Sequence, residues 1–502
     1  MAGLAGLALP LRHVAAAEPP PAASADFEED WQVIYLGTVR IGYAHMAEEK
    51  RMHDGKPVIA TDLEMVMVIS RFGQSVKIRT LTRSLETPTG ELLTIDHTLQ
   101  NPPAAPNSMR GVVADGKLTL ELNTGGKLTR KELPWDESIK APAYQSRILR
   151  EHRLKPGDEL SFKTFDPTPN DVISLKFKAV AMETVALLGG VEKELLKVNV
   201  TNSFTPTIPS IEYIDAAGDA LKTTSALGGL TLTIYKVAKA EALAELKGEE
   251  VDFGVTTLVR LPPIPNARRT QRVVYRITTP GEDPAHVFAT GGTQQMKPAG
   301  PQAIDLTVQA LAPGAAGGEG PPGREFTIPS RLIQSDDEAV KNAAARAVGD
   351  ETDPWKNAVA MEQWVYKNLR KKNFSTLLAS AAEVARTLSG DCTEHAVLLA
   401  GMARARGIPS RVVVGLVYVE DRNRGAAFGG HMWTELFING LWRPLDATLG
   451  QGGIAADHIK MSDSSLADAA AAPLAAFLPM LSVLGKMKIE VRESSAEVPP
   501  TK

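Results

Sequence analysis

The 502-residue sequence contains a single cysteine, Cys392, and this scarcity excludes two kinds of structure. One thiol cannot form an intramolecular disulfide framework, and it cannot supply a multi-cysteine zinc or iron–sulfur site. An excess of charge of one sign is also lacking, because 55 basic residues nearly balance 59 acidic ones and leave a net charge of −4. A balance so close to neutral gives no electrostatic footprint for nucleic acid, so no nucleic-acid partner is expected.

Long hydrophobic runs are missing as well. The apolar segment 469–484 is shorter than a bilayer span and contains two prolines, so we expect a short helix and a strand in an Ala-rich tail (463–502). Membrane association is therefore not expected, although the composition does not exclude it. Residues 1–25 resemble either a clipped signal peptide or a disordered leader, because their positive charge follows the apolar run. Export to the periplasm or cell envelope and a cytoplasmic location both stay open.

The hydrophobic and charged contents, 43% and 23%, are typical of a globular protein, and the length favours several domains. Residues 26–248 alternate apolar and polar side chains in many short runs. The alternation from Trp31 to Tyr43, interrupted at Gly37, predicts a β-hairpin. The whole region predicts one or two antiparallel β-domains, arranged as a sandwich or a half-barrel. Its isolated histidines, His45 and His97, are interpreted as structural.

A second β-rich block is expected over residues 249–311, and it is followed by the clearest boundary in the chain. Eight of the eleven residues from Pro313 to Gly323 are glycine or proline, which cannot continue a helix or a central strand. We therefore predict a linker over residues 312–324 that few contacts cross, and a separate catalytic domain over residues 325–462.

After this linker the apolar period changes to 3.6, which is typical of amphipathic helices. The expected helices begin at the capping box of Ser335 and Glu338, at Asp353, and at Asp391, and the expected strands span 411–419, 432–438 and 441–445. Helices followed by an antiparallel sheet predict an α+β domain. The fold class is thus multidomain, with all-β N-terminal domains and an α+β C-terminal domain.

Candidate catalytic residues gather where the helical period gives way to strands. Cys392 follows the expected N-cap Asp391, where unpaired N–H groups and the helix dipole would stabilise a thiolate and lower the thiol pKa. His431 begins one expected strand, and Asp446 ends the next. Neighbouring antiparallel strands would bring these two side chains together. A thiol, an imidazole and a carboxylate are the minimum set for acyl transfer through a thioester.

Four motifs in the same order resemble the transglutaminase-like superfamily, in its bacterial multidomain type. They are the Gly-x-Cys segment Ser389–Ala396, the segment Arg404–Arg411, the His-x-Trp-x-Glu segment Gly430–Glu435 and the Trp-x-x-x-Asp-x-Thr segment Trp442–Thr448. The resemblance covers roughly residues 326–460. It implies a papain-like core in which Cys392 attacks a carboxamide carbonyl, His431 accepts and returns the proton, and Asp446 orients the imidazole.

The helix start also suggests supporting groups. The backbone N–H groups of Cys392 and Thr393 are candidate oxyanion donors. Asp391, His395 and Trp433 are expected to support the catalytic residues without reacting. Asp457 and His458 follow the triad and are candidates for shaping the site. No metal or other cofactor is expected, because the polar residues adjacent to Cys392 on a helix face different directions.

Two functions stay open from the sequence. The first is a cysteine peptidase, amidase or transamidase that acts on protein or peptide carboxamides. The second is a non-catalytic binding or assembly protein that uses the papain-like domain as a scaffold. The substrate, the acceptor (water or an amine) and the oligomeric state are not determined by these motifs.

Overall fold

The N-terminal half of the protein forms one large sheet. The computed structural model describes residues 26–227, 229–246, 251–311, 315, 317, 320–421, 425–468 and 473–495. Its first fifteen strands follow the order β8-β7-β6-β5-β4-β3-β2-β1-β15-β14-β13-β12-β11-β10-β9. The strands are β1 (Phe27–Leu36), β2 (Val39–His53), β3 (Lys56–Arg71), β4 (Gln74–Glu86), β5 (Leu92–Gln100), β6 (Asn107–Ala114), β7 (Lys117–Thr124), β8 (Lys127–Pro134), β9 (Ile139–Lys140), β10 (Glu159–Asp166), β11 (Asp171–Ala186), β12 (Glu192–Asn202), β13 (Ser210–Ile214), β14 (Ala220–Leu227) and β15 (Leu230–Val237).

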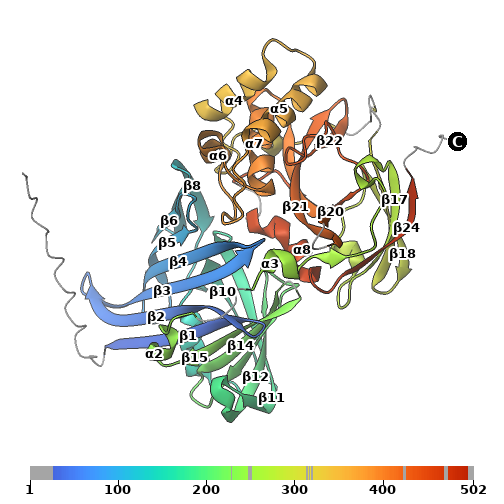
Figure 1. Cartoon of the computed structure of the whole chain (residues 1–502). Helices are drawn as coiled ribbons and strands as arrows, with labels where there is room; N and C mark the ends of the chain where they lie inside the picture. Colours follow the sequence, from blue (N-terminus) through green and yellow to red (C-terminus); the bar gives the residue numbers. More distant parts are fainter. Residues whose placement is uncertain are drawn as a thin grey trace, which may run out of the picture.

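Alternating burial drives the formation of this sheet, as the sequence predicted. β1 and β2 form the expected hairpin, and Gly37 at its turn has a positive φ of 62°, which glycine adopts without strain. In β11, Ile173, Leu175 and Phe177 are buried and the residues between them are exposed. Figure 1 shows the sheet, blue to green, curving below the orange helices. The all-β N-terminal fold is confirmed, and its strands form one continuous sheet.

Helix α1 (Tyr144–His152) covers only part of the sheet. Its buried residues Tyr144, Ile148 and Leu149 pack in one hydrophobic cluster with residues of β11, including Phe177. Two short helices, α2 (Lys239–Ala242) and α3 (Phe253–Thr256), follow the last strand of the sheet. The apolar face of a sheet needs a covering layer, and α1 supplies this layer for only a few strands.

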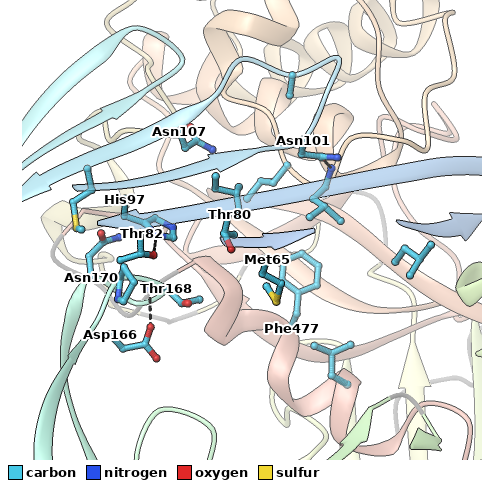
Figure 2. A pocket seen from close by; sticks show the side chains of 18 of the residues that line it. Met65, Thr80, Thr82, His97, Asn101, Asn107, Asp166, Thr168, Asn170 and Phe477 are labelled. Atoms are coloured by element: carbon cyan, nitrogen blue, oxygen red, sulfur yellow. Dashed lines mark hydrogen bonds between the residues drawn. The ribbon is translucent and has the colours of Figure 1, made fainter. Parts of the chain in front are cut away.

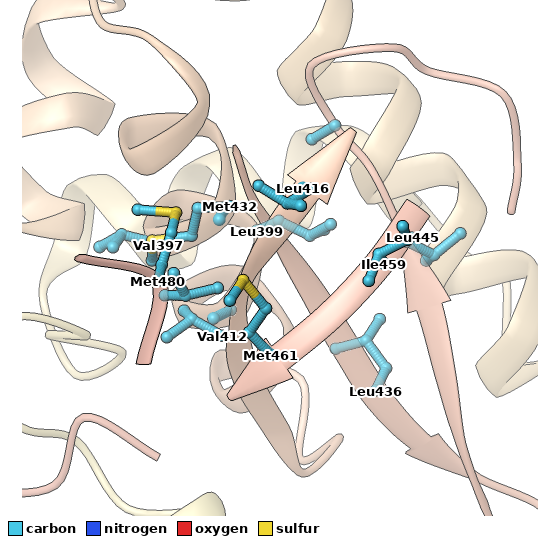
Figure 3. Close-up of a cluster of buried hydrophobic side chains, with 14 of the residues drawn as sticks. Val397, Leu399, Val412, Leu416, Met432, Leu436, Leu445, Ile459, Met461 and Met480 are labelled. Atoms are coloured by element: carbon cyan, nitrogen blue, oxygen red, sulfur yellow. The ribbon is translucent and has the colours of Figure 1, made fainter. Parts of the chain in front are cut away.

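The C-terminal domain has the α+β arrangement that the sequence predicted. Its helices are α4 (Glu338–Val348), α5 (Pro354–Asn368), α6 (Ala381–Thr387) and α7 (Cys392–Ala405). Its sheet has the order β16-β21-β20-β23, with β22 paired to β21. The strands are β16 (Val259–Arg260), β20 (Ser410–Asp421), β21 (Gly425–Ile438), β22 (Leu441–Leu445) and β23 (His458–Ser464). Figure 3 shows apolar side chains of α7, such as Val397 and Leu399, beside Leu416 and Met432 of the sheet.

Helix boundaries follow local capping. Asp337, not Ser335, caps α4, because its carboxylate accepts a hydrogen bond from Ala339 N–H at 2.8 Å. The expected start at Ser335 is therefore wrong by two residues. Asp353 caps α5 as predicted, with Pro354 in the first turn. The sequence analysis missed α6, which has only seven residues and is too short to show a clear apolar period.

A third sheet joins the segment before the expected linker to the end of the chain. It has the order β18-β19-β17-β24 and contains β17 (Arg272–Thr278), β18 (Gln294–Gly300), β19 (Ala303–Gln309) and β24 (Lys488–Ser495). Val273, Tyr275 and Ile277 of β17 are fully buried in the same hydrophobic cluster as α4, α5 and α7. The expectation that few contacts cross the linker is therefore wrong. Tertiary pairing of β17 with β24 overrides the local Gly/Pro signal.

Parts of three predicted segments lie outside the described residues. These are the leader 1–25, much of the linker 312–324, and residues 469–472 and 496–502 of the tail. Within the tail, the structure describes the short helix α8 (Leu478–Val483), which follows a 3₁₀ turn, η5 (Pro473–Phe477), and the strand β24. In the part of the chain that the structure describes, no helix is long and apolar enough to cross a membrane.

The shared core predicts how fragments of the chain behave. A fragment of residues 325–502 lacks β17 and should not fold stably, because each of three missing core side chains contributes about 1.5–3 kcal/mol of burial. A fragment of residues 251–502 keeps β17 and should unfold cooperatively. Circular dichroism during thermal unfolding compares the two. Equal, cooperative melting of both fragments would mean that the C-terminal domain begins after the linker.

Candidate active site

Cys392 is the first residue of α7, and hydrogen bonds hold the start of that helix. The Asp391 carboxylate accepts a hydrogen bond from Thr393 N–H at 2.9 Å, and the Glu394 carboxylate accepts one from Asp391 N–H at 2.9 Å. This capping box satisfies N–H groups that a helix start otherwise leaves unpaired. The thiol is therefore attached to a well-anchored helix end.

The same capping box corrects one expectation about oxyanion donors. The N–H of Thr393 is already directed at the Asp391 carboxylate, and the Thr393 hydroxyl donates to the same oxygen at 2.9 Å. An N–H group that caps its own helix is not available to a developing oxyanion. Thr393 is therefore not an oxyanion donor in this structure. The N–H of Cys392 stays a prediction.

His431 lies on β21 beside the start of α7. The backbone N–H of Met432, the next residue on that strand, donates a hydrogen bond to the Cys392 thiol. The Thr434 hydroxyl donates to the Ala396 carbonyl at 2.9 Å and joins the same strand and helix one turn further on. Cys392 and His431 line the same cavity of about 880 Å³. The thiol and the imidazole thus line the same cavity.

Asp446 meets His431 across neighbouring strands. β21 and β22 pair antiparallel with Thr434 opposite Leu445, so Asp446, the residue after Leu445, lies beside the segment of β21 that contains His431. The distance from His431 Nε2 to Asp446 Oδ2 is 2.8 Å. When a carboxylate accepts the Nε2 proton of an imidazole, Nδ1 is the nitrogen that is free to accept a proton. This arrangement is the one expected of a base and its orienting carboxylate.

A second histidine extends the chain of hydrogen bonds behind Asp446. His458 Nε2 lies 3.3 Å from Asp446 Oδ2, and His458 Nδ1 lies 2.7 Å from Asp457 Oδ1. Asp457 also forms a 2.7 Å ion pair with Arg268, which belongs to the segment before the linker. Asp457 and His458 were predicted from the sequence as candidates for shaping the site, whereas nothing local distinguishes Arg268.

Interactions within this series of hydrogen-bonded side chains lower the pKa of Asp446 and raise the pKa of His458. Burial by itself would raise the pKa of Asp446, but the charges and hydrogen bonds of His431 and His458 outweigh it and hold that pKa well below its usual range. Burial would lower the pKa of His458, yet its hydrogen bonds to Asp446 and Asp457 raise it. Asp446 therefore stays ionised beside His431.

The cluster of His431, Asp446 and His458 is also the place where a metal ion would be sought. Their ligand atoms lie within 4.8 Å of one another, and all three side chains are buried. However, the same Asp446 oxygen contacts both imidazoles at hydrogen-bonding distance. That geometry suits an imidazole–carboxylate–imidazole chain, in which the carboxylate lone pairs are already engaged.

Arg71 is the residue near the thiol that sequence reasoning missed. It comes from the end of β3 in the N-terminal sheet, and its guanidinium forms a 2.8 Å ion pair with the fully buried carboxylate of Asp391. The same guanidinium donates to the carbonyl groups of Phe374 at 3.4 Å and Thr376 at 3.1 Å. Arg71 and Asp391 are separated by 320 positions, so no local sequence signal could connect them.

The thiol pKa differs from the one expected at a helix start. Burial raises the pKa of Cys392 well above its ordinary value, and the Asp391 carboxylate raises it further, whereas the Arg71 charge lowers it. The expected lowering of this pKa by the helix start is therefore wrong. The resting group is a neutral thiol, and it needs a base to become a nucleophile.

The two remaining predicted residues support this arrangement. His395 is buried, and its Nδ1 lies 2.6 Å from the Asp391 carbonyl oxygen, so it holds the helix start. The Trp433 ring stacks on His431 with a centroid distance of 6.3 Å and meets His458 edge-on at 5.3 Å. Trp433 therefore keeps the two imidazoles in place.

The cavity in front of the thiol extends away from the C-terminal domain. It runs between that domain and the inner face of the N-terminal sheet, and α8 and the preceding turn border it. Figure 2 shows Met65 and Phe477 near its middle, and a polar group that includes His97 and Asp166 at one side. His97, interpreted from the sequence as structural, accepts or donates a 2.8 Å hydrogen bond with Thr82.

Two solved structures are similar to parts of the chain. A candidate cysteine protease from Cytophaga hutchinsonii is 18% identical, with a TM-score of 0.29, and the match covers 46% of this chain and 91% of that protein. A beta-barrel-like protein from Brucella abortus is 13% identical, with a TM-score of 0.30, and covers 41% of this chain and 95% of that protein. Both TM-scores are below 0.5, and no inference rests on them.

Sequence comparison identifies the C-terminal domain. An uncharacterized protein of Haemophilus influenzae is 28% identical over 134 residues, which cover 22% of this chain and 36% of that protein's length. Residues 341–447 match the family model of the transglutaminase-like superfamily. The matched segment contains α5, α6, α7, the strand β21 that carries His431, and Asp446, which directly follows β22. These residues therefore form a domain of the transglutaminase-like superfamily, as the four sequence motifs predicted.

Proposed function

We propose that the protein is a cysteine-dependent enzyme that transfers the acyl group of a carboxamide through a thioester on Cys392. One observation carries this proposal. A histidine hydrogen-bonded to a buried carboxylate at 2.8 Å lines the same cavity as the sole cysteine of the chain. That constellation is the one used by cysteine acyl-transfer enzymes on several folds.

The proposed reaction begins with a neutral thiol. His431 Nδ1 takes the thiol proton as the sulfur adds to the carboxamide carbonyl, and Asp446 stabilises the imidazolium that forms. The carbon–nitrogen bond then breaks, and His431 returns the proton to the leaving amine. In the second half of the reaction, His431 deprotonates water or an amine, which attacks the thioester and releases Cys392.

The proposed substrates are protein or peptide carboxamides, and hydrolysis and transamidation are both consistent with the site. Intact-mass spectrometry should detect an acyl adduct on Cys392 in the wild-type protein and none on Cys392→Ala. Product analysis with and without a primary amine separates the two acceptors. A complete absence of adduct and product would favour the non-catalytic binding protein instead.

Replacing Asp446 tests the role of the carboxylate. Asp446→Asn should keep the fold but lower kcat by about 10³–10⁴-fold, because the amide favours the wrong tautomer of His431. Turnover is measured together with circular dichroism. As a matched control, Asp463→Asn changes a partly exposed carboxylate on β23 and should leave turnover nearly unchanged. Loss of structure in Asp446→Asn in proportion to the loss of activity would make Asp446 a structural residue.

The pH dependence of alkylation tests whether the pKa of the Cys392 thiol is raised. Because burial raises the pKa of Cys392, its reaction with iodoacetamide should rise with pH only above the ordinary thiol value of about 8.5. Arg71→Leu removes a nearby positive charge that lowers this pKa and should move the profile to still higher pH. Arg79→Leu, on the other face of the sheet, should not move it. A profile centred below the ordinary value would contradict the neutral thiol.

A further inference from the structure

The cavity that Cys392 and His431 line is built mainly by the N-terminal sheet. Apolar side chains from distant strands face it, and six of them are Ile34, Met65, Ile69, Leu122, Leu175 and Ile234. They come from β1, β3, β7, β11 and β15, so the whole curved sheet surrounds one space. A volume of about 880 Å³ is within the range of sites that enclose a small-molecule ligand.

The residues of β3 show that the sheet separates two different surfaces. Leu63, Met65 and Ile69 face the cavity, whereas Glu64 and Val66 border a small polar hollow on the opposite face. This alternation is the one expected of a strand with a core on its inner side. Because α1 covers only part of the inner face, apolar side chains are left lining an open space. Such surface favours an apolar ligand.

Several polar side chains on the cavity wall are engaged within the protein. The Asn101 amide donates to the carbonyl groups of Lys77 at 3.0 Å and Ser375 at 2.9 Å. Thr82 pairs with His97 at 2.8 Å, and the Thr164 hydroxyl donates to a carbonyl group. These side chains are therefore not free to bind a ligand that carries many donors and acceptors.

The backbone N–H and C=O groups of the lining strands are also hydrogen-bonded within the sheet. The lining strands lie inside the sheet and pair with neighbours on both sides, and neither edge strand, β8 or β9, contributes a lining residue among those described. A bound peptide brings one N–H and one C=O per residue, and burying them unpaired costs free energy. A hydrocarbon chain has no such groups. The wall therefore fits a hydrocarbon chain better than a peptide.

The C-terminal segment covers this space next to the thiol. Phe477, Met480 and Leu484 from α8 and its flanks line the cavity. Met480 packs against Gly430, the residue before His431, where an added Cβ would lie 3.1 Å from the Met480 sulfur. Methionine side chains are flexible and adapt to ligands of varied shape. An apolar chain in the cavity would thus pass directly beside the proposed catalytic groups.

We propose that the cavity binds the long hydrocarbon chain of a fatty-acyl amide, whose amine part belongs to a peptide or protein. This inference rests on the proposed function of Cys392. The sulfur forms a bond to the acyl carbon, the carbon–nitrogen bond breaks, and the amine leaves with the proton that His431 took from the thiol. The acyl chain is assigned to the enclosed side because it stays attached to Cys392 as the thioester after the amine has left in the first half-reaction.

A binding experiment tests the cavity independently of catalysis. The full-length Cys392→Ala protein is titrated with 11-(dansylamino)undecanoic acid, and its fluorescence reports binding. Met65→Trp fills the cavity and should weaken binding by at least about tenfold. Its control, Val66→Trp, adds the same ring to the opposite face and should bind within about twofold of Cys392→Ala. Both substitutions are made in the Cys392→Ala background.

Three results would overturn the inference. They are no binding by Cys392→Ala, equal binding by the Met65→Trp and Val66→Trp variants, or displacement of the probe by an apolar peptide but not by palmitate. Because Met65→Trp could disturb folding, Ile69→Trp is tested in parallel, and circular dichroism must match Cys392→Ala for either variant to count. Weaker binding in one correctly folded variant supports the assigned cavity.

A second experiment links the cavity to the reaction. Acetyl, octanoyl and palmitoyl anilides are compared in the wild type, and kcat/KM should rise with chain length by up to about fourfold per buried methylene. The Met65→Trp variant should lose this dependence on chain length. Probe binding without any acyl adduct on Cys392 would reject the proposed function alone. An adduct with no dependence on chain length would reject the cavity assignment alone.

Discussion

The buried carboxylate of Asp391 joins the two halves of the protein beside the thiol. It caps α7 through Thr393, and it pairs with Arg71 from the N-terminal sheet at 2.8 Å. Breaking a buried ion pair by removing one partner costs about 3–5 kcal/mol, so this contact constrains how the sheet sits on the C-terminal domain. The position of the helix end that carries Cys392, and the cavity in front of it, both depend on this pair.

The surroundings of the site hold Cys392 and Asp446 in opposite protonation states. Burial keeps Cys392 protonated, whereas two histidines keep Asp446 ionised. A neutral thiol that shares a cavity with an imidazole hydrogen-bonded to an ionised carboxylate favours proton transfer as the sulfur attacks. The chain from Asp446 through His458 to Asp457 ends at Arg268, which compensates the second buried carboxylate. The segment before the linker thus contributes a charge to the electrostatic surroundings of the site.

The N-terminal sheet is better understood as part of the site than as an appended module. Its inner face supplies most of the cavity wall, and its Arg71 reaches the helix start. The segment of β17 likewise completes the hydrophobic core of the C-terminal domain. The proposed chemistry would therefore take place in the transglutaminase-like domain, and the proposed binding cavity would be formed largely by the N-terminal sheet. A large curved sheet suits this task because its interior can enclose an apolar chain without unpaired backbone groups.

Local patterns determined the elements and the candidate triad. Alternation predicted the hairpin at Gly37, the 3.6 period predicted α5 and α7, and the four motifs pointed to Cys392, His431 and Asp446, because each of these signals is contained in its own short segment of sequence. Only the tertiary structure decided the pKa of Cys392, the approach of Arg71, and the pairing of β17 with β24. Each depends on burial or on partners far apart in the chain, and those are products of packing that no short window of sequence contains.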